Sequence, residues 1–419
     1  MRLPASSARL GHDENPALPR VGELRALAAS LAREAGRVPK PLRVAASLGA
    51  LFERWRRREF PPRAQTVERL AHSSGMSREL LDESLDALLA PFTAAALDAF
   101  ATRLEGRRLG VGAFVMPANV AGAGVHELVA ALLAGAAALV KVSSREPFFF
   151  PAMLATLSEI APDIGARVAV AVFGRERPEL ADAMLDSTDF AVALGDDETI
   201  SSFDARKTFF GFGSRASGAF VTRQACEQRG EHTALALARD VAMFEQRGCL
   251  SPHHVFVECA DRAGADGFAG ALARALSALA QTLAPARLPF EAASAIRRVR
   301  ESARWRRLGG RDVALWEGPA MAWTVVMDPQ ARFQLSPAYR TVTITPVADL
   351  GDLDERLAAM HGRLEAFSVT AGTSAEGAAN LLARRGVTWI CEPGSIQSPP
   401  LEWRHGGGAF LDFISGAQR

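Results

Sequence analysis

Residues 238–258 read Ala-Arg-Asp-Val-Ala-Met-Phe-Glu-Gln-Arg-Gly-Cys-Leu-Ser-Pro-His-His-Val-Phe-Val-Glu, and the period of the apolar residues changes along this stretch. The first half has helical spacing, and its Arg-Gly pair is typical of the basic last turn and glycine stop of a helix. It therefore predicts an amphipathic helix that ends at Gly248. The face expected to be buried consists of Leu235, Ala238, Val241 and Ala242.

The second half of the same stretch predicts a buried strand. Pro252 cannot continue a helix, and Val255 and Val257 alternate with their neighbours as in a strand. Cys249 is therefore expected in a short loop between two rigid elements, a position that suits a reactive nucleophile. The adjacent His253 and His254 are expected to be packing or surface groups.

The composition of the 419-residue chain is that of a globular protein. Hydrophobic residues make up 48% of the sequence and the net charge is +1, so we expect neither disorder nor a nucleic-acid or anionic-membrane partner. The length predicts two or three domains. We expect no membrane span, because the apolar run at 129–142 is short and contains glycine, and no signal peptide.

The cysteines show no spacing typical of a metal site, so we expect no bound metal. Reduced thiols and a cytoplasmic location are the simplest interpretation. Three of the four are expected to be buried structural thiols: Cys226, Cys259 and Cys391.

Residues 1–105 are rich in helix-forming residues and are expected to form a helical region packed on the next domain. Short apolar runs then alternate with helical patterns over residues 106–222, which predicts βαβ units and a parallel sheet covered on both faces. Ligands of such sheets lie at the carboxyl ends of the strands. Strands are expected at 109–115, 137–142, 168–173 and 189–194, and helices at 122–135, 150–160, 178–187 and from 199.

A second α/β domain is expected over residues 223–395, and residues 396–419 are expected to form a C-terminal loop and tail. The glycines at 406–408 neither follow a strand nor open a helix, so they do not predict a phosphate-binding loop. Helices are expected at 265–283, 289–298, 353–361 and 376–385, and strands at 321–326, 341–347, 366–371 and 386–390.

Together these segments resemble the aldehyde dehydrogenase superfamily, and most closely its LuxC-like fatty acyl-CoA reductases. The resemblance runs from about Leu109 to the C-terminus, and its most specific part is Phe-x-Gln-x-x-Cys-x-Ser-Pro at 244–252. It implies an α/β protein with a Rossmann-type cofactor domain and a catalytic domain in which Cys249 is the nucleophile. Because a helix C-terminus would raise the pKa of this thiol, activation is expected from loop N–H groups, Arg247 or the cofactor.

The resemblance assigns an oxyanion-binding role to Asn119, in the segment Met-Pro-Ala-Asn-Val at 116–120. A turn-forming role is the alternative for an asparagine close to a proline. The resemblance also places His405 near the end of the acyl channel, where a structural role is expected over proton donation.

Lys141, at the end of an apolar run, resembles the family lysine that binds the adenosine ribose. Ser144 stands where relatives that prefer NAD carry an acidic residue. With Ser143 and Arg145 it can bond to a 2′-phosphate, so NADPH is expected, with NADH as the alternative. Gly195 resembles the family glycine turn at the pyrophosphate. The three acidic residues that follow it, Asp-Asp-Glu, are expected to interact favourably with the helix dipole and to point outward.

Gly211 departs from the family pattern. Aligned on Gly-Ser-Arg-Ala-Ser at 213–217, it replaces the glutamate that activates water in aldehyde-oxidising relatives. The resemblance therefore implies NADPH-dependent reduction of an acyl-CoA or acyl-carrier thioester to an aldehyde by an acyl-Cys249 intermediate. The alternatives are the reverse CoA-acylating dehydrogenase, acyl-phosphate reduction, and a cofactor-free cysteine acyl carrier or acyltransferase. The family is usually oligomeric, so a homo-oligomer is expected.

Overall fold

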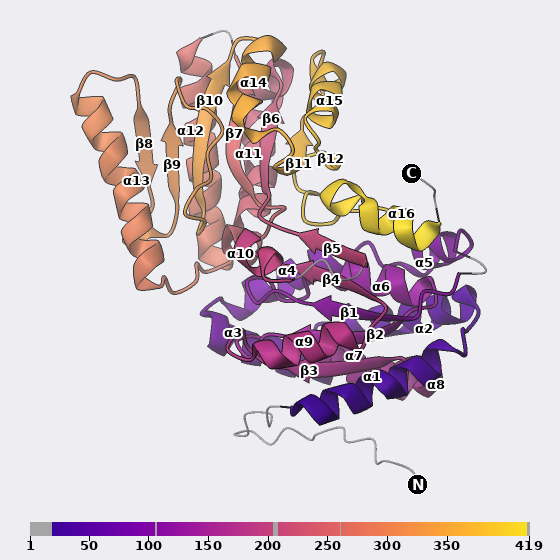
Figure 1. Ribbon diagram of the computed structural model, residues 1–419. Coiled ribbons are helices and arrows are strands. Elements are labelled where there is room, and N and C mark those ends of the chain that lie inside the picture. Colours follow the sequence, from indigo (N-terminus) through magenta and orange to yellow (C-terminus); the bar gives the residue numbers. More distant parts are fainter. Residues whose placement is uncertain (1–18, 105–106, 204–207, 260, 417–419) are drawn as a thin grey trace. The chain divides into compact units, whose positions relative to one another are not determined.

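The computed structural model describes residues 19–104, 107–203, 208–259 and 261–416. The chain divides into two compact units (Figure 1). The boundary expected between residues 105 and 106 lies outside the described residues. The first unit comprises Met1–Arg69, Phe92–Gly213 and Phe410–Arg419, and the second comprises Leu70–Pro91 and Ser214–Ala409.

The first unit contains a five-stranded sheet in the order β3-β2-β1-β4-β5, and all its strands are parallel. Both faces are covered, which explains why β1, β2 and β4 are continuous apolar runs. The strands are β1 (Val111–Val115), β2 (Ala137–Val142), β3 (Val168–Val172), β4 (Phe190–Leu194) and β5 (Thr208–Phe212).

Helices α1 (Val21–Ala35) and α9 (Pro178–Asp186) pack together against the sheet, with Leu24 and Leu31 of α1 in the same core as Val111 of β1. Another helix, α2 (Pro41–Trp55), packs against α5, α6 and α7. Helix α3 (Pro61–Ser74) crosses the boundary between the units after Arg69. The remaining helices of this unit are α5 (Ala94–Ala101), α6 (Val125–Leu133), α7 (Phe149–Ile160), α8 (Pro162–Gly165), α10 (Asp197–Ser201) and α16 (Ala409–Ser415).

The C-terminal segment contains helix α16 where we expected a loop. Phe413 of α16 packs on Phe190 and Phe210, with ring centroids 5.3 and 5.0 Å away. Arg107 donates hydrogen bonds to the carbonyl oxygens of Phe413 and Ile414, at 2.9 and 3.1 Å. Aromatic packing and a basic residue at the helix end thus return the end of the chain to the first unit.

The second unit contains a seven-stranded sheet in the order β12-β11-β6-β7-β10-β9-β8. Neighbouring strands are parallel except β8, which runs antiparallel to β9 at one edge. The strands are β6 (Ala216–Val221), β7 (Pro252–Glu258), β8 (Ala314–Glu317), β9 (Thr324–Met327), β10 (Thr341–Val347), β11 (Leu364–Val369) and β12 (Trp389–Cys391).

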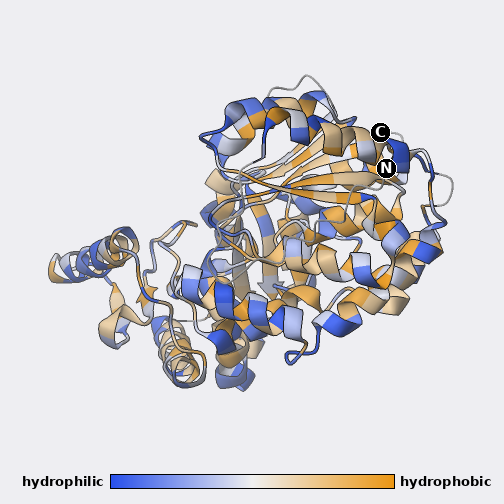
Figure 2. Cartoon of the chain, turned by 90° about the horizontal axis from the view of Figure 1, so that it is seen from below, coloured by the Kyte–Doolittle hydropathy of each residue, from blue (hydrophilic) through white to orange (hydrophobic). Residues whose placement is uncertain are grey.

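Two cores cover this second sheet. Helices α11 (Arg223–Ala242) and α12 (Arg262–Thr282) pack on Val255 and Val257 of β7, whereas α14 (Leu350–Leu357) and α15 (Ala375–Arg384) share a core with Phe256. Figure 2 shows the strands as mainly hydrophobic and the outer helix surfaces as hydrophilic. The other helices are α4 (Arg78–Leu89), α13 (Phe290–Leu308), η1 (Met243–Gln246), η2 (Pro319–Met321), η3 (Ala358–Met360) and η4 (His405–Gly407).

The unit boundaries differ from the expected ones in two places. Residues 216–221 fall inside the cofactor domain expected over residues 106–222, but they form β6, which pairs with β7 and β11 in the second sheet. Helix α4, expected to pack on the cofactor domain, packs on η1 of the second unit, where the amide of Phe244 donates to Oγ of Ser84 at 3.0 Å. The reason is the leucine-rich face of α4, which is buried within the second unit.

Within the described residues, one stretch, Arg78–Ala101, is apolar and long enough for a membrane span by length and composition. The structure divides it into α4 and α5, with Thr93 as the N-cap of α5. The leucine side chains of α4 that define its apolar face are buried inside the protein. The stretch therefore does not show a membrane span.

Candidate active site

Cys249 lies in the turn between η1 and β7, and its side chain is half-buried. The expected strand after it is confirmed as β7, but the expected helix before it ends at Ala242 rather than Gly248. The expected buried face is also wrong at one position, because Leu235 is 48% exposed. Because the helix ends at Ala242, Cys249 does not directly follow the helix end, although the sequence had suggested that it would.

The segment that replaces the last helical turn is left-handed. Phe244, Glu245 and Gln246 have φ values of 50°, 53° and 61°. A second left-handed run, over residues 338–340, lies against it, and the amide of Tyr339 donates to the carbonyl oxygen of Glu245 at 2.9 Å. Such conformations cost about 1–3 kcal/mol for each residue and persist where surrounding contacts hold them. Strained backbone of this kind is typical of functional sites.

A fully buried ion pair joins the two left-handed runs. Nη2 of Arg340 lies 2.8 Å from Oε1 of Glu245, and the exposed fractions of these side chains are 0% and 1%. The same carboxylate oxygen accepts a hydrogen bond from the amide of Ala286 at 3.1 Å. Burial raises the pKa of Glu245, and the Arg340 guanidinium opposes this shift. The pair therefore fixes the backbone immediately before the Cys249 turn.

The side chain of Gln246 bridges the two ends of this turn with hydrogen bonds. Its amide nitrogen donates to the carbonyl oxygens of Pro252 and Thr341, at 2.6 and 2.9 Å, and its Oε1 accepts from the amide of Thr341 at 2.9 Å. The side chain is fully buried. Both ends of the Cys249 turn are thus tied to each other and to the start of β10.

Ser217 of β6 holds Cys249 itself. Its hydroxyl donates to the carbonyl oxygen of Cys249 at 2.6 Å and accepts from the amide of Ala366 at 3.0 Å. Both hydrogen-bonding roles of this buried hydroxyl are used, so its orientation is fixed. Ser217 was not among the predicted site residues, because a contact between residues 32 apart leaves no local pattern in the sequence.

Cys249 packs against an apolar cluster. Its members come from the Cys249 turn, β11, β12 and the segment that follows β12. Aromatic and aliphatic surface next to a half-buried thiol suits the alkyl chain of an acyl group. The cluster consists of Leu250, Ala366 and Ile396 together with Cys249, Trp389, Cys391 and Trp403.

The segment around Gly406 is tied to β11. The buried carboxylate of Glu365 accepts hydrogen bonds from the amide of Gly406 at 3.2 Å and from the Thr388 hydroxyl. Nη2 of Arg215 donates to the carbonyl oxygen of Gly406 at 3.2 Å, and its Nε lies 3.3 Å from Glu365. His405, which is mostly buried, stacks on Trp403 with ring centroids 4.2 Å apart.

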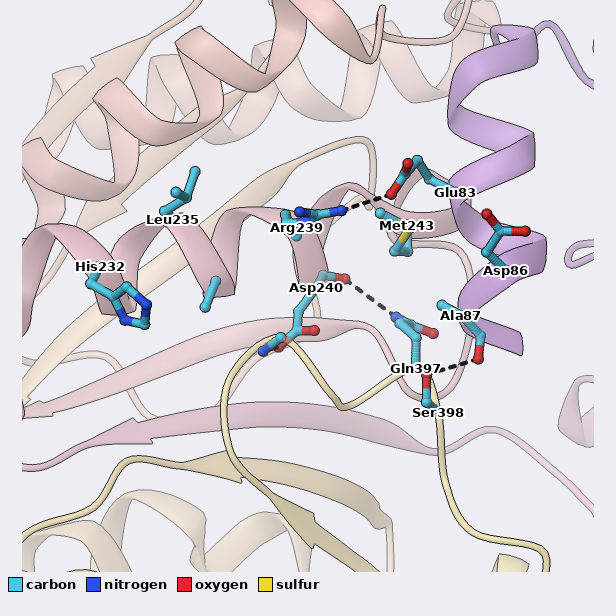
Figure 3. A pocket seen from close by; sticks show the side chains of 12 residues that line it. Glu83, Asp86, Ala87, His232, Leu235, Arg239, Asp240, Met243, Gln397 and Ser398 are labelled. Carbon is cyan, nitrogen blue, oxygen red and sulfur yellow. Dashed lines mark hydrogen bonds and ion pairs between the residues drawn. The ribbon is translucent and has the colours of Figure 1, made fainter. Parts of the chain in front are cut away.

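The segment after β12 is also held by hydrogen bonds to α11 (Figure 3). Asp240 of α11 accepts a hydrogen bond from the amide of Gly394 at 2.7 Å, and Gln397 donates to the Asp240 carbonyl oxygen at 3.3 Å. Burial raises the pKa of Asp240 to about 7. Gln397 also reaches the Ser251 hydroxyl at 3.3 Å, so this segment and the Cys249 turn share one hydrogen-bond network.

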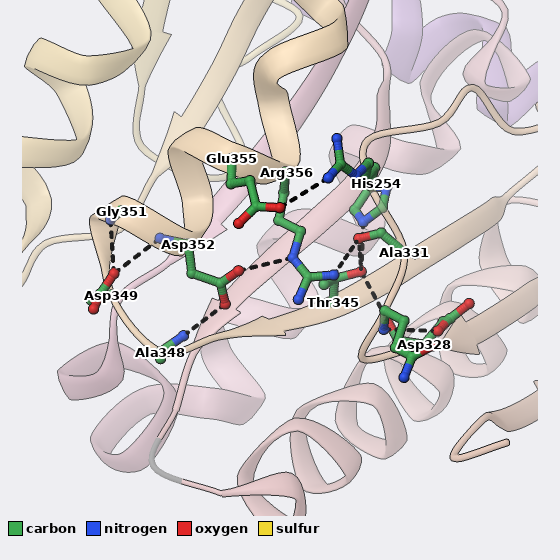
Figure 4. Close-up of polar contacts among 12 residues, drawn as sticks. His254, Asp328, Ala331, Thr345, Ala348, Asp349, Gly351, Asp352, Glu355 and Arg356 are labelled. Carbon is green, nitrogen blue, oxygen red and sulfur yellow. Dashed lines mark hydrogen bonds and ion pairs between the residues drawn. The ribbon is translucent and has the colours of Figure 1, made fainter.

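His253 and His254 lie inside β7 and are structural, as expected. Nδ1 of His253 lies 2.8 Å from the Ser336 hydroxyl, and Nε2 of His254 lies 2.9 Å from the Thr345 hydroxyl (Figure 4). Burial lowers the pKa of His253 to about 4 and that of His254 to about 3, so both rings are neutral at pH 7. No group of three potential metal ligands is present in the described part of the chain.

The remaining predicted residues belong to the first unit. Parallel strand order 3-2-1-4-5 places the carboxyl ends of β1, β2 and β4 at one edge of the sheet, where such sheets bind dinucleotides. Asn119 follows β1, Lys141 lies in β2, the segment 143–145 follows it, and Gly195 follows β4. Topology therefore brings all the predicted cofactor residues to the expected edge.

Lys141 is half-buried at this edge. Burial lowers the pKa of its ammonium, neighbouring Arg175 lowers it further, and Glu176 opposes the shift. The ammonium lies 5.5 Å from the centroid of the Phe173 ring. Arg175 and Glu176, which follow β3, were not predicted, although a charged pair at the end of a predicted strand was a usable signal.

The acidic turn after Gly195 has a structural use. Asp196 is the N-cap of α10 and accepts from the amide of Thr199 at 2.8 Å. Its other oxygen pairs with Arg175 at 2.9 Å. The hydrogen bond from the Thr199 hydroxyl, together with those from the Thr199 amide and Arg175, lowers the pKa of Asp196 to about 2. Asp196 thus caps α10, a role that was not predicted from the sequence, and its charge is balanced by Arg175.

Segment 143–145 and Asn119 are accessible. Ser144, Arg145 and Asn119 are exposed, and Ser143 accepts a hydrogen bond from the amide of Arg145 at 3.2 Å. Gly211 in β5 has no room for a side chain, because a Cβ atom there would lie 2.6 Å from Cγ2 of Ile200. A glutamate at this position would require its neighbours to move.

The architecture of the two sheets is that of the aldehyde dehydrogenases. The chain matches an NAD-dependent benzaldehyde dehydrogenase from Corynebacterium glutamicum with a TM-score of 0.68 and 15% identity, over 90% of this chain and 86% of that one. It matches an aldehyde dehydrogenase from Bacillus cereus, solved with NAD+, with a TM-score of 0.67 and 13% identity, over 90% and 82%. The expected fold class is confirmed.

The chain belongs to the acyl-CoA reductase (LuxC) family, whose sequence profile matches residues 55–415. It is 23% identical over 292 residues to the long-chain acyl-protein thioester reductase of Aliivibrio fischeri. That alignment covers 68% of this chain and 58% of the relative, so the chain spans less than two thirds of the relative's length. The predicted family resemblance is confirmed.

Proposed function

We propose that this protein reduces an acyl thioester to an aldehyde with NADPH, through an acyl group bound to Cys249. The observation that carries the proposal is the turn that presents Cys249. Two left-handed runs, Gln246 and Ser217 hold it rigidly beside an apolar cluster. The family match and the aldehyde dehydrogenase fold support the same chemistry.

In the proposed reaction, the Cys249 thiolate attacks the thioester carbonyl, and the bond from carbon to the donor sulfur breaks. The donor thiolate leaves and takes up a proton. A bound nicotinamide would supply a hydride to the acyl carbon. The resulting thiohemiacetal oxyanion would collapse with cleavage of its bond to the Cys249 sulfur, which releases the aldehyde and restores the Cys249 thiolate. The balance is one thioester, one NADPH and one proton converted to aldehyde, free thiol and NADP+.

One feature supports reduction over hydrolysis of the acyl enzyme. Gly211 stands in the place of the water-activating glutamate, and the packing of Ile200 against it leaves no room for a side chain. The acyl enzyme then persists until hydride transfer.

The residues at the edge of the first sheet fit a nicotinamide dinucleotide. The strand order provides the crevice, and Lys141, Ser144 and Arg145 provide a cation, a hydroxyl and a second cation. A carboxylate at position 144 would repel a 2′-phosphate, so its absence supports the choice of NADPH.

Replacing Ser144 by glutamate is expected to shift the ratio of kcat/KM for NADPH to that for NADH toward NADH by about tenfold or more, because like charges repel. Initial rates of cofactor oxidation with a fixed long-chain acyl-CoA measure this ratio. Ser144→Gln has nearly the same size without the charge and should leave the ratio within about threefold of wild type. Equal shifts in both variants would contradict the assigned role of position 144.

Replacing Ser217 by alanine is expected to lower kcat by about tenfold with little change in KM, because one positioning hydrogen bond is worth about 1.4 kcal/mol. The matched control is Ser368→Ala, which removes a buried hydroxyl that has no hydrogen-bond partner in the described structure. That control should keep its kcat. If both variants lose activity equally, Ser217 only stabilises the fold.

A further inference from the structure

Helix α13 carries unusually exposed apolar side chains. Among the large hydrophobic residues of the described chain, the three most exposed are Phe290 at 85%, Leu308 at 78% and Trp305 at 70%, and all lie on α13. Single exposed apolar residues are normal on a protein surface. Three of this size on one helix indicate a surface that is covered by a partner.

These three side chains share one face of the helix. Each residue turns an α-helix by about 100°, so Phe290 and Leu308 lie on the same side and Trp305 about 60° away. Arg298 lies two turns before Trp305, and Arg297 three turns before Leu308. We call these five residues, Phe290, Arg297, Arg298, Trp305 and Leu308, the α13 face.

The opposite side of α13 holds the helix in place. Ile296 and Ala303 are buried, and Ala303 packs in a small core with Val313 and Val326. Three arginines outside the α13 face form ion pairs with the sheet edge. Nη1 of Arg300 lies 3.1 Å from Glu317. Further ion pairs with the same sheet edge are Arg304–Glu317 and Arg306–Asp328.

Arg297 and Arg298 differ from these anchoring arginines. Both are exposed, and neither forms a hydrogen bond or ion pair with any residue that the structure describes. Arginine and tryptophan are the residues most enriched at the energetic centres of protein interfaces. Glu301 lies on the same side of the helix but is paired with Arg304, so Arg297 and Arg298 supply the remaining charge. A surface with two such cations and aromatic anchors fits an acidic protein.

We propose that the α13 face docks the acidic surface of an acyl carrier protein that delivers the acyl thioester to Cys249. The inference rests on the proposed function and identifies the protein that donates the acyl group. Charge complementarity supports it, and the relative from Aliivibrio fischeri is named for acting on a protein-bound acyl thioester.

A membrane surface fits the α13 face less well. Phe290 and Trp305 are 15 residues apart, roughly 22 Å along the helix, and the side between them carries charged residues, including Glu301. Helices that lie in a membrane interface present a continuous apolar face instead.

Steady-state kinetics with two donors of the same chain length test the proposal: myristoyl acyl carrier protein and myristoyl-CoA. The double variant Arg297→Glu/Arg298→Glu and the single variant Trp305→Ala should each lose about tenfold or more in kcat/KM with the carrier protein. With myristoyl-CoA they should stay within about twofold of wild type. Raising the salt concentration should lower the wild-type kcat/KM with the carrier protein but not with myristoyl-CoA.

The matched control is Arg25→Glu/Arg33→Glu on α1, which makes the same charge change at two exposed arginines of another helix. It should behave as wild type with both donors. Equal losses with both donors in the α13 variants would show a structural role and overturn the docking proposal. Unchanged activity with the carrier protein would overturn it too, while the proposed function stands.

The proposed function itself would fail if the wild-type protein released aldehyde from neither donor.

Two further measurements distinguish other occupants of the α13 face. Sedimentation with anionic phosphatidylglycerol vesicles would assign the face to a membrane if wild type binds and Trp305→Ala does not. A change of molar mass in solution on Trp305→Ala would assign it to a second copy of the chain. Either result would overturn the carrier-protein proposal.

Discussion

Replacing Cys249 by alanine is expected to lower aldehyde formation by roughly three orders of magnitude or more, the usual loss when a covalent nucleophile is removed. NADPH oxidation in the presence of a long-chain acyl-CoA measures the loss. The fold should be retained, because the side chain is only half-buried and the turn is held by Gln246 and Ser217 through groups other than the thiol. Radiolabelled acyl groups should no longer attach to the protein.

Cys391 provides the matched control for this experiment. It belongs to the same apolar cluster as Cys249, and burial raises the pKa of its thiol well above the usual range. A thiol that stays protonated is a poor nucleophile, so Cys391→Ala should keep its activity and its acyl labelling. Loss of labelling in Cys391→Ala, with labelling retained in Cys249→Ala, would show that the nucleophile was assigned to the wrong cysteine.

The two strands with the clearest sequence signals were predicted at their observed bounds. Residues 137–142 and 341–347 are strands β2 and β10. Strand β2 is a continuous apolar run that begins soon after a glycine, and strands buried on both faces produce such runs wherever they lie in the sheet. This signal depends on burial alone, so it survives without knowledge of the tertiary contacts.

Three strands were not predicted from the sequence, because they lack a continuous apolar run. Strands β5 and β6 contain Gly211 and Gly218, and only residues 213–215 separate them although they belong to different sheets. A local pattern cannot show that the chain changes sheets between them. Strand β8 is a half-buried antiparallel edge strand and lacks the apolar run of a central strand.

The segment before Cys249 could not be predicted for a different reason. Phe244, Glu245 and Gln246 contain no glycine, so their sequence favours continuing the helix. Their left-handed conformation is imposed by residues 338–340, almost a hundred positions later, through hydrogen bonds and a buried ion pair. A local preference that fails beside the proposed nucleophile is expected at functional sites.

Replacing Arg340 by methionine is expected to destabilise the protein by about 3–5 kcal/mol at pH 8, because it leaves the buried Glu245 carboxylate without its partner. Methionine fills a similar space to arginine. The left-handed backbone at position 340 should be no more strained with methionine than with arginine. Urea denaturation followed by tryptophan fluorescence measures the free energy of unfolding. A lower kcat is expected as well, because the turn that holds Cys249 loses one of its supports.

The pH dependence identifies the cause. Burial already raises the pKa of Glu245, and loss of Arg340 removes the attraction that opposed this shift. A carboxyl whose pKa is raised in the folded state binds a proton more tightly there than in the unfolded chain, so stability falls as pH rises above the unfolded value of about 4.5. The deficit of Arg340→Met should therefore be smallest near pH 4.5 and grow toward pH 8. The double variant Glu245→Gln/Arg340→Met has no buried charge and should show no such growth. A deficit independent of pH would mean that lost packing, rather than an unpaired carboxylate, destabilises the single variant.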